Sequence, residues 1–105
     1  MSPSGKKLGI LLSGCPLQPP FRHGVRVAAA ALNLGADVYL YCIDEAVKGV
    51  GDPELQALRP RGLKLYGCAY GAHHHGVPVD DRATFAGLTV VSDMAAGTDR
   101  FISFQ

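Results

Sequence analysis

Residues 7–14, KLGILLSG, are the stretch that decides the fold of this chain. The apolar run from Leu8 to Leu12 is short and continuous, and the stretch ends at Gly14, two residues before Pro16. Such a run is typical of a strand that is buried on both faces, as in a parallel sheet covered by helices. The sequence therefore predicts an α/β domain built around a largely parallel sheet.

The segments that follow continue the alternation of strand and helix. An Ala-rich helix is expected from about Arg22 to Leu34, because alanine favours helices and Gly35 is a natural stop. Residues 36–43, ADVYLYCI, are rich in β-branched and aromatic side chains, which favours a second strand. Further helices or helical turns are expected at residues 44–47, 52–60, 68–76, 81–87 and 93–99, and further strands at 62–67, 88–92 and 100–104. The sheet is thus expected to have five strands.

The composition fits a single domain that needs no stabilising metal or disulfide. The chain has 105 residues, of which 48% are hydrophobic and 18% charged, so it can bury a core without a metal or a disulfide. The net charge is +1 and the basic residues are scattered, which argues against a nucleic-acid partner. No apolar run approaches the roughly 20 residues of a membrane span. We expect a single domain over residues 1–105, with residues 1–6 flexible.

The chain has three cysteines, an odd number, and their spacing does not match a disulfide framework. Free thiols indicate a reducing environment, so we expect a cytoplasmic location. The start of the chain, KKLGILLSGC, resembles a lipoprotein signal. Its apolar core from Leu8 to Leu12 is, however, shorter than the roughly 7–15 residues that a signal core needs.

Chemically capable side chains follow the ends of the expected strands. In chain order these are Cys15, then Asp44 and Glu45, then Cys68, and finally Ser92 and Asp93. The carboxyl ends of parallel strands meet at one edge of a sheet, where binding groups collect. The sequence therefore predicts that this edge carries the functional site.

Cys68 is the leading candidate, because it stands at the start of an expected helix. Unpaired N–H groups and the partial positive charge of a helix N-terminus favour thiolate over thiol. The alternative is a small buried apolar residue, the commoner role of a cysteine. Cys15 follows a strand end and is a candidate second thiol, whereas Cys42 lies within a strand and is expected in the core.

Three consecutive histidines, His73, His74 and His75, follow Cys68 in the same expected helix. Helical neighbours point about 100° apart, so the three cannot bind one metal as an i, i+4 pair does. The spacing from Cys68 is not a recognised zinc pattern. A metal site built from these histidines with a cysteine stays open as an alternative, and one histidine is a candidate charge partner for the thiol.

Several features together resemble the DsrE/DsrF-like family of small sulfur-relay proteins (DsrE/DsrF/DsrH and TusD-like). They are a strand ending in Cys68 with Gly76 and Val77 following, the helix ending in LGADVYLYCID, and the late segments TVVSDM and RFISF. They cover the chain from Leu8 to Phe104. The resemblance implies a three-layer α/β/α fold and assembly as a homotrimer or homohexamer. It also implies that Cys68 carries sulfur as a persulfide, exchanged with a partner protein.

The leading hypothesis is thus a sulfurtransferase-like sulfur carrier that needs no cofactor. Cys68 is the sulfur acceptor, and its assigned neighbours are the backbone of Ala69 and Tyr70 as anion binder, His73 and His74 as charge partners, and Cys15 as second thiol. Two alternatives remain: a non-catalytic module that binds a metal or small ligand through residues 73–75 and a cysteine, and a structural family member without chemistry. Whether the protein is an enzyme is left open.

Overall fold

A five-stranded sheet forms the centre of the molecule. The computed structural model describes residues 4–105. The strands are β1 (Lys7–Leu12), β2 (Asp37–Cys42), β3 (Lys64–Cys68), β4 (Thr84–Ala86) and β5 (Arg100–Phe104). They are all parallel, in the order β4-β3-β2-β1-β5. The predicted five-stranded parallel sheet is therefore confirmed.

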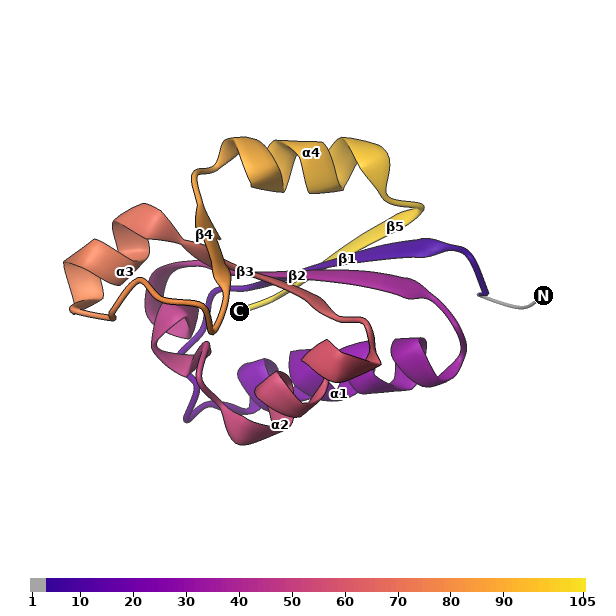
Figure 1. The fold of residues 1–105 in the computed structure, drawn as a ribbon, viewed down its shortest axis with the longest axis horizontal. Coiled ribbons are helices and arrows are strands. Elements are labelled where there is room, and N and C mark those ends of the chain that lie inside the picture. Colours follow the sequence, from indigo (N-terminus) through magenta and orange to yellow (C-terminus); the bar gives the residue numbers. More distant parts are fainter. Residues whose placement is uncertain (1–3) are drawn as a thin grey trace.

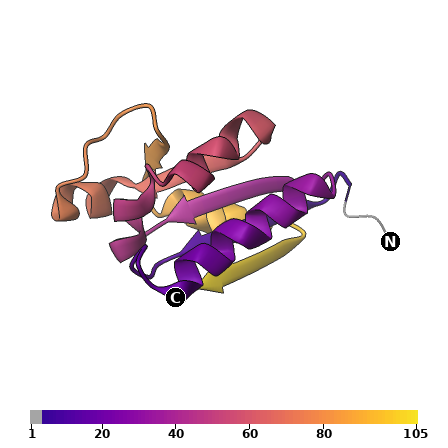
Figure 2. The same cartoon turned by 90° about the horizontal axis from the view of Figure 1, so that it is seen from below.

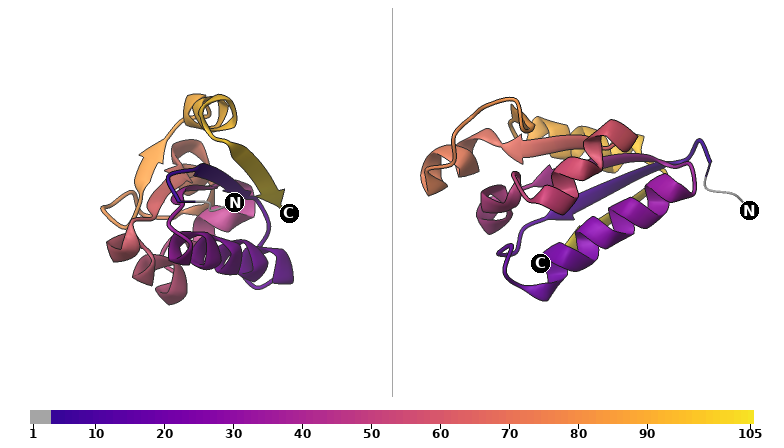
Figure 3. Two further views of the ribbon diagram at one scale, coloured as in Figure 1. Left: turned by 90° about the vertical axis from the view of Figure 1, so that its right-hand side faces the viewer. Right: turned by 60° about the horizontal axis from the view of Figure 1, so that its bottom comes forward.

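Helices cover both faces of this sheet. The α-helices are α1 (Pro19–Asn33), α2 (Pro53–Ala57), α3 (Ala69–His75) and α4 (Thr89–Gly97), and the 3₁₀ helices are η1 (Asp44–Gly49) and η2 (Arg59–Arg61). Helices α1 and α2 lie on one face and α4 lies alone on the other (Figure 1). The view from below shows α1 running along the sheet, and the end-on view separates the three layers (Figures 2 and 3). The chain thus has the expected α/β/α arrangement.

The main core lies between α1 and the sheet. Ile10 and Leu12 of β1 are fully buried, as are Phe21 and Val25 of α1. A Cβ on Gly24 would lie 2.3 Å from Leu12 Cδ2, which is a clash. Helix α1 can therefore pack this closely against β1 only because residue 24 has no side chain. The apolar run of β1 is continuous because α1 and α4 cover its two faces.

The opposite face of the sheet carries the residues that matter for the site. Side chains alternate along a strand, so Gly9 faces α4 when Leu12 faces α1. A Cβ on Gly9 would indeed lie 3.3 Å from the hydroxyl oxygen of Thr98, just beyond α4. The parallel register then places four further side chains on this face: Tyr39, Tyr41, Tyr66 and Cys68.

The fourth strand is where the sequence prediction is wrong. Residues 88–92 were expected to form it, but Thr89–Gly97 is helix α4, and the strand is Thr84–Ala86 in a segment expected to be a helical turn. The β-branched residues at 89–91 favour a strand locally, yet the chain must return from the carboxyl edge to the amino edge before β5. As a result, Ser92 and Asp93 lie within α4 and not at the carboxyl edge.

The amino-terminal segment joins the sheet before β1 begins. The Gly5 N–H donates to the Gly35 carbonyl at 3.1 Å, and the Asp37 N–H donates to the Lys6 carbonyl at 2.8 Å. Residues 1–3, part of the segment expected to be flexible, lie outside the described residues. Within residues 4–105, no helix has the length and apolar character needed to cross a membrane.

Candidate thiol site at the carboxyl edge of the sheet

Cys68 joins β3 to α3 at the carboxyl edge of the sheet. It is the last residue of β3 and the N-cap of α3, as the sequence predicted. Its Sγ accepts a hydrogen bond from the backbone N–H of Gly71 at 3.3 Å. The Cys68 sulfur thus fills the capping position that Ser or Asp occupies in many helices. The assigned anion binders, Ala69 and Tyr70, are the first two residues of α3.

The position of α3 is set by contact with the 3₁₀ helix that follows β2. A Cβ on Gly71 would lie 3.1 Å from Val47 Cγ2 and 3.7 Å from the Asp44 nitrogen, so α3 lies directly against η1. Asp44 has a φ of 53°, a left-handed conformation that aspartate tolerates better than most residues. This turn directs η1 toward α3 and fixes the surroundings of the thiol.

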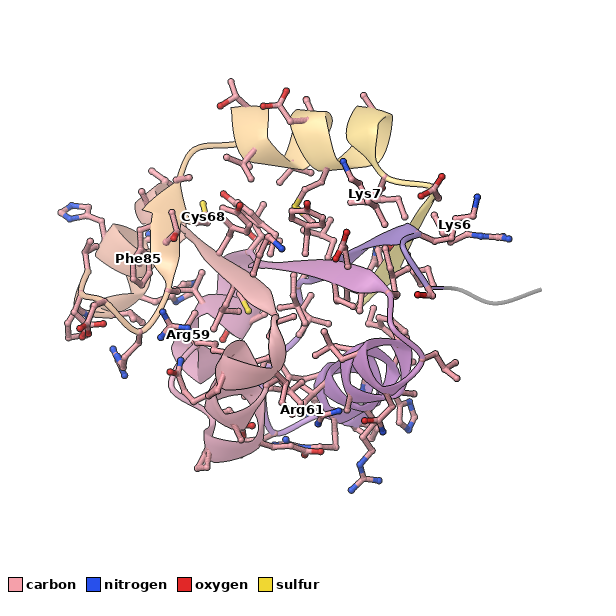
Figure 4. All side chains as sticks on the ribbon, turned by 45° about the vertical axis from the view of Figure 1, so that its right-hand side comes forward. Lys6, Lys7, Arg59, Arg61, Cys68 and Phe85 are labelled. Carbon is pink, nitrogen blue, oxygen red and sulfur yellow. The ribbon has the colours of Figure 1, made fainter. Side chains whose placement is uncertain are left out.

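Tyr41 lies across β3 beside the thiol. It is fully buried, and its hydroxyl donates to the carbonyl of Ala86 in β4 at 2.9 Å. The pKa of Tyr41 is raised well above its ordinary value, first by burial and then by hydrogen bonding to Cys68. Cys68 is only 5% exposed. The thiol is therefore enclosed on the α4 side of the sheet (Figure 4).

Sequence reasoning missed Tyr41. A signal was present, since a tyrosine inside a strand expected to be buried on both faces must find a partner for its hydroxyl. The sequence alone does not identify the hydrogen-bond partner of this hydroxyl, because the partner depends on the strand order and the register of the sheet.

Cys42 is a core residue, as predicted. It is fully buried on the α1 side of the sheet, opposite to Cys68. Burial raises the pKa of the Cys42 thiol to about 12, so this residue stays protonated at neutral pH.

Cys15 lies at the same edge as Cys68 but belongs to a different neighbourhood. It stands in the partly exposed loop after β1, where its carbonyl accepts from the Gln18 N–H at 2.9 Å. Its charged neighbour is Lys48, whose pKa is raised first by a hydrogen bond to Glu45 and more weakly by Cys15. Strand β2 separates the strands that carry the two thiols, which places those strands roughly 10 Å apart.

The histidines lie at the far end of α3, where His74 and His75 are close to Glu45 of η1. His73 and His74 are exposed, and the His74 and His75 rings meet edge to face at 4.9 Å. The pKa of Glu45 is lowered, first by its hydrogen bond to Lys48 and to a smaller extent by His75 and His74. The acidic neighbour of His74 and His75 is thus Glu45. Within residues 4–105, no three side chains of His, Cys, Asp or Glu are gathered closely enough to hold a metal ion.

Comparison with solved structures identifies a close match in architecture. A crystal structure superposes with a TM-score of 0.82, covering 94% of this chain and 99% of the other. The match is the ychN protein of E. coli. The ychN protein has a DsrE-like fold, and the two chains are 17% identical, so the similarity establishes the fold alone. No family model matches the sequence, and no curated protein matches it.

Proposed function

We propose that this protein is a small sulfur carrier in which Cys68 accepts a sulfane sulfur as a persulfide. One observation carries the proposal: the Cys68 sulfur caps a helix at the carboxyl edge of a parallel sheet and accepts the Gly71 N–H. An N–H pointing at the sulfur stabilises the thiolate, which is the form that exchanges with other sulfur atoms. The DsrE-like fold of the ychN protein is consistent with this kind of function.

The transfer step is an exchange between a thiolate and a persulfide. The Cys68 thiolate attacks the outer sulfur of a donor persulfide, the S–S bond of the donor breaks, and the donor leaves as a thiolate. A new S–S bond now holds the sulfur on Cys68, and the proton released by Cys68 is taken up by the donor through solvent. Delivery to an acceptor thiolate is the same step in reverse, so no oxidant or reductant is consumed.

The neighbours of Cys68 have distinct roles in this scheme. The N–H groups of the first turn of α3, at Ala69, Tyr70 and Gly71, stabilise negative charge on the persulfide. The Tyr41 hydroxyl lies beside the sulfur and limits access to it. Because Cys68 is 5% exposed and is paired with Ala86 of β4, a donor reaches the sulfur when β4 moves aside.

The remaining parts of the proposal concern assembly and charge. His73 and His74 are the proposed charge partners for a protein donor or acceptor that docks at this edge. We also propose a cytoplasmic location and assembly as a homotrimer or homohexamer. Light scattering of the purified protein measures the molar mass of the assembly. Large exposed apolar side chains near this edge support an assembled state, namely Tyr70, Val79 and Leu88.

The test is sulfur loading of the purified protein. The protein is incubated with glutathione persulfide and digested, and each cysteine peptide is weighed by mass spectrometry. We expect Cys68 to gain one sulfur atom, and Cys68→Ser to abolish that gain. Cys15→Ser and Cys42→Ala serve as matched controls and should load Cys68 normally. Absence of sulfur on Cys68 in the wild-type protein, with sulfur on Cys15 instead, would overturn the assignment.

A second candidate is a structural protein without thiol chemistry. The low exposure of Cys68 favours it, since most buried cysteines act as small apolar residues. This candidate predicts that Cys68 neither loads sulfur nor reacts with iodoacetamide in the folded protein. The same mass measurement therefore separates the two.

A further inference from the structure

A cavity lies between α4 and the sheet, away from the capped thiol. Its volume is about 280 Å³, and it opens near the amino edge, where α4 leads into β5. Tyr39 and Tyr66 line it from the sheet, and Val90 and Met94 line it from α4. Lys7 lies beneath the end of α4 that leads into β5 (Figure 4).

The cavity lies over Tyr39 and Tyr66, next to Gly9, where the end of α4 lies close to β1. Gly9 pairs with Tyr39 on one side and with Phe101 on the other. A Cβ at position 9 would lie 2.8 Å from Phe101 Cδ1 and 3.3 Å from the Thr98 hydroxyl oxygen. The glycine therefore lets the end of α4 settle over β1, while the two tyrosines keep the middle of the helix away from β2 and β3.

The lining combines aromatic surface with one charge of each sign. Lys7 contributes an ammonium group from the sheet, and Asp93 contributes a carboxylate from α4. In the part of the chain that the structure describes, neither group takes part in an ion pair. A second ammonium, that of Lys64, is 4.9 Å from the centroid of the Tyr39 ring on the same face.

We propose that this cavity binds a zwitterionic amino acid with an aromatic or thioether side chain. Lys7 pairs with its carboxylate and Asp93 with its ammonium group. The side chain packs between the tyrosine rings and the thioether of Met94, a favourable contact for aromatic and sulfur-containing groups. The volume of about 280 Å³ is just below the roughly 300–1,000 Å³ of ligand pockets, so a single-ring ligand fits and a nucleotide does not.

This site is independent of sulfur transfer. Cys68 is two residues beyond Tyr66 on the same face of β3, but it does not line the cavity. Cys68→Ser should therefore bind the ligand as the wild-type protein does. Failure of sulfur loading and failure of ligand binding are thus distinguishable results.

Three probes that differ by one charged group test the proposal. L-Phenylalanine carries both charges, phenylpropionate lacks the amine, and phenethylamine lacks the carboxylate. Binding is followed by amide chemical shifts in ¹⁵N-labelled protein, with Gly97 and Thr98 as reporters in the cavity wall. We expect saturable shifts, with phenylalanine binding about tenfold more tightly than either analogue.

Two variants assign the charges. Lys7→Met keeps the aliphatic stem and should weaken phenylalanine and phenylpropionate about tenfold, while leaving phenethylamine unchanged. Asp93→Asn should weaken phenylalanine and phenethylamine and leave phenylpropionate unchanged. The neighbours Lys6→Met and Ser92→Ala are the matched controls and should bind as wild type. The same spectra show that each variant is folded.

Two results would overturn the proposal. One is the absence of saturable shifts at Gly97 and Thr98 with any probe at millimolar concentration. The other is equal binding of all three probes that neither Lys7→Met nor Asp93→Asn alters, which indicates adventitious apolar contact only.

Discussion

The hydroxyl of Tyr41 in β2 lies 2.9 Å from the carbonyl oxygen of Ala86 in β4, so this side chain spans the intervening strand β3. Ala86 is paired in the sheet with Cys68. One hydrogen bond thus fixes the short edge strand and encloses the thiol. It links the stability of β4 to access to the candidate site.

Tyr41→Phe should loosen this arrangement. The Ala86 carbonyl loses its donor, so we expect the free energy of unfolding to fall by about 1–2 kcal/mol. Cys68 should also react faster with iodoacetamide, because β4 moves more easily. Urea unfolding and alkylation followed by peptide mass mapping measure the two effects. Tyr66→Phe is the control, since no hydrogen-bond partner is found for its hydroxyl among residues 4–105; equal effects in both variants would contradict this role for Tyr41.

Alkaline pH should destabilise the protein through Cys42. Its pKa is raised by burial from 9.0 to about 12, so the folded state holds a proton that the unfolded state releases. The resulting stabilisation is complete below pH 9 and is lost as the pH rises from 9 toward 12. One such proton contributes a slope of up to about 1.4 kcal/mol per pH unit. Cys42→Ala should show a shallower decline over this range in urea titrations, at a cost of about 1 kcal/mol near neutral pH.

Acidic pH should destabilise the protein through Asp52. Its pKa is lowered first by hydrogen bonds from Arg22 and also by the N–H of Leu55, which it caps at the start of α2. A lowered pKa gives stability that is present above the unfolded value of 3.8 and lost as the pH falls through the folded value. Asp52→Asn should therefore flatten the acid limb of the stability curve while it keeps the cap. Asp52→Ala should lose about 1 kcal/mol at neutral pH as well.

The control for Asp52 is Glu54, the second carboxylate that Arg22 contacts. The side chain of Glu54 is 42% exposed, against 15% for Asp52. Glu54→Gln should change the free energy of unfolding by well under 1 kcal/mol. An equally large loss in this variant would show that Arg22, and not the cap, carries the effect.

Two glycines in helices should respond in opposite ways to alanine. At Gly24 the new Cβ would lie 2.3 Å from Leu12 Cδ2, so Gly24→Ala should cost about 1–3 kcal/mol. At Gly97 no atom outside the neighbouring residues and the backbone of α4 lies within 4 Å of the new Cβ, so Gly97→Ala should be neutral or stabilise by up to about 1 kcal/mol. Thermal and urea unfolding of both variants check the contrast. A destabilised Gly97→Ala would mean that α4 packs more tightly than the contacts indicate.

Most of the fold was predictable because four of the five strands are short, largely apolar runs that stand between Gly, Pro or polar breaks. Strands β1, β2, β3 and β5 lie where those runs predicted them. Strand β4 was not predictable, because three residues are too few to show a period. It is held by pairing with β3 and by Phe85, which packs over Gly67; a Cβ on Gly67 would lie 2.8 Å from that ring.

The candidate site was predictable only where chain order determines it. A cysteine at the junction of a strand and a helix can be recognised from sequence, and Cys68 caps α3 as expected. Tyr41 and Glu45 reach their partners through strand order and the packing of α3 against η1, which no local pattern encodes. Asp93 was expected at the carboxyl edge, and the structure places it over the cavity because α4 replaces the expected strand.

The connection from β4 to β5 crosses the whole sheet, since these two strands form its opposite edges. Strand β5 pairs with β1, whose residues precede it by about 90 positions in the sequence. Bringing β5 to β1 closes the longest loop of the chain and is therefore the step of sheet assembly with the largest entropic cost. We therefore expect α4 and β5 to dock last during refolding and to open first under native conditions, as one unit in hydrogen exchange. The segment that forms last is also the one that covers the cavity, through Val90, Asp93 and Met94 of α4.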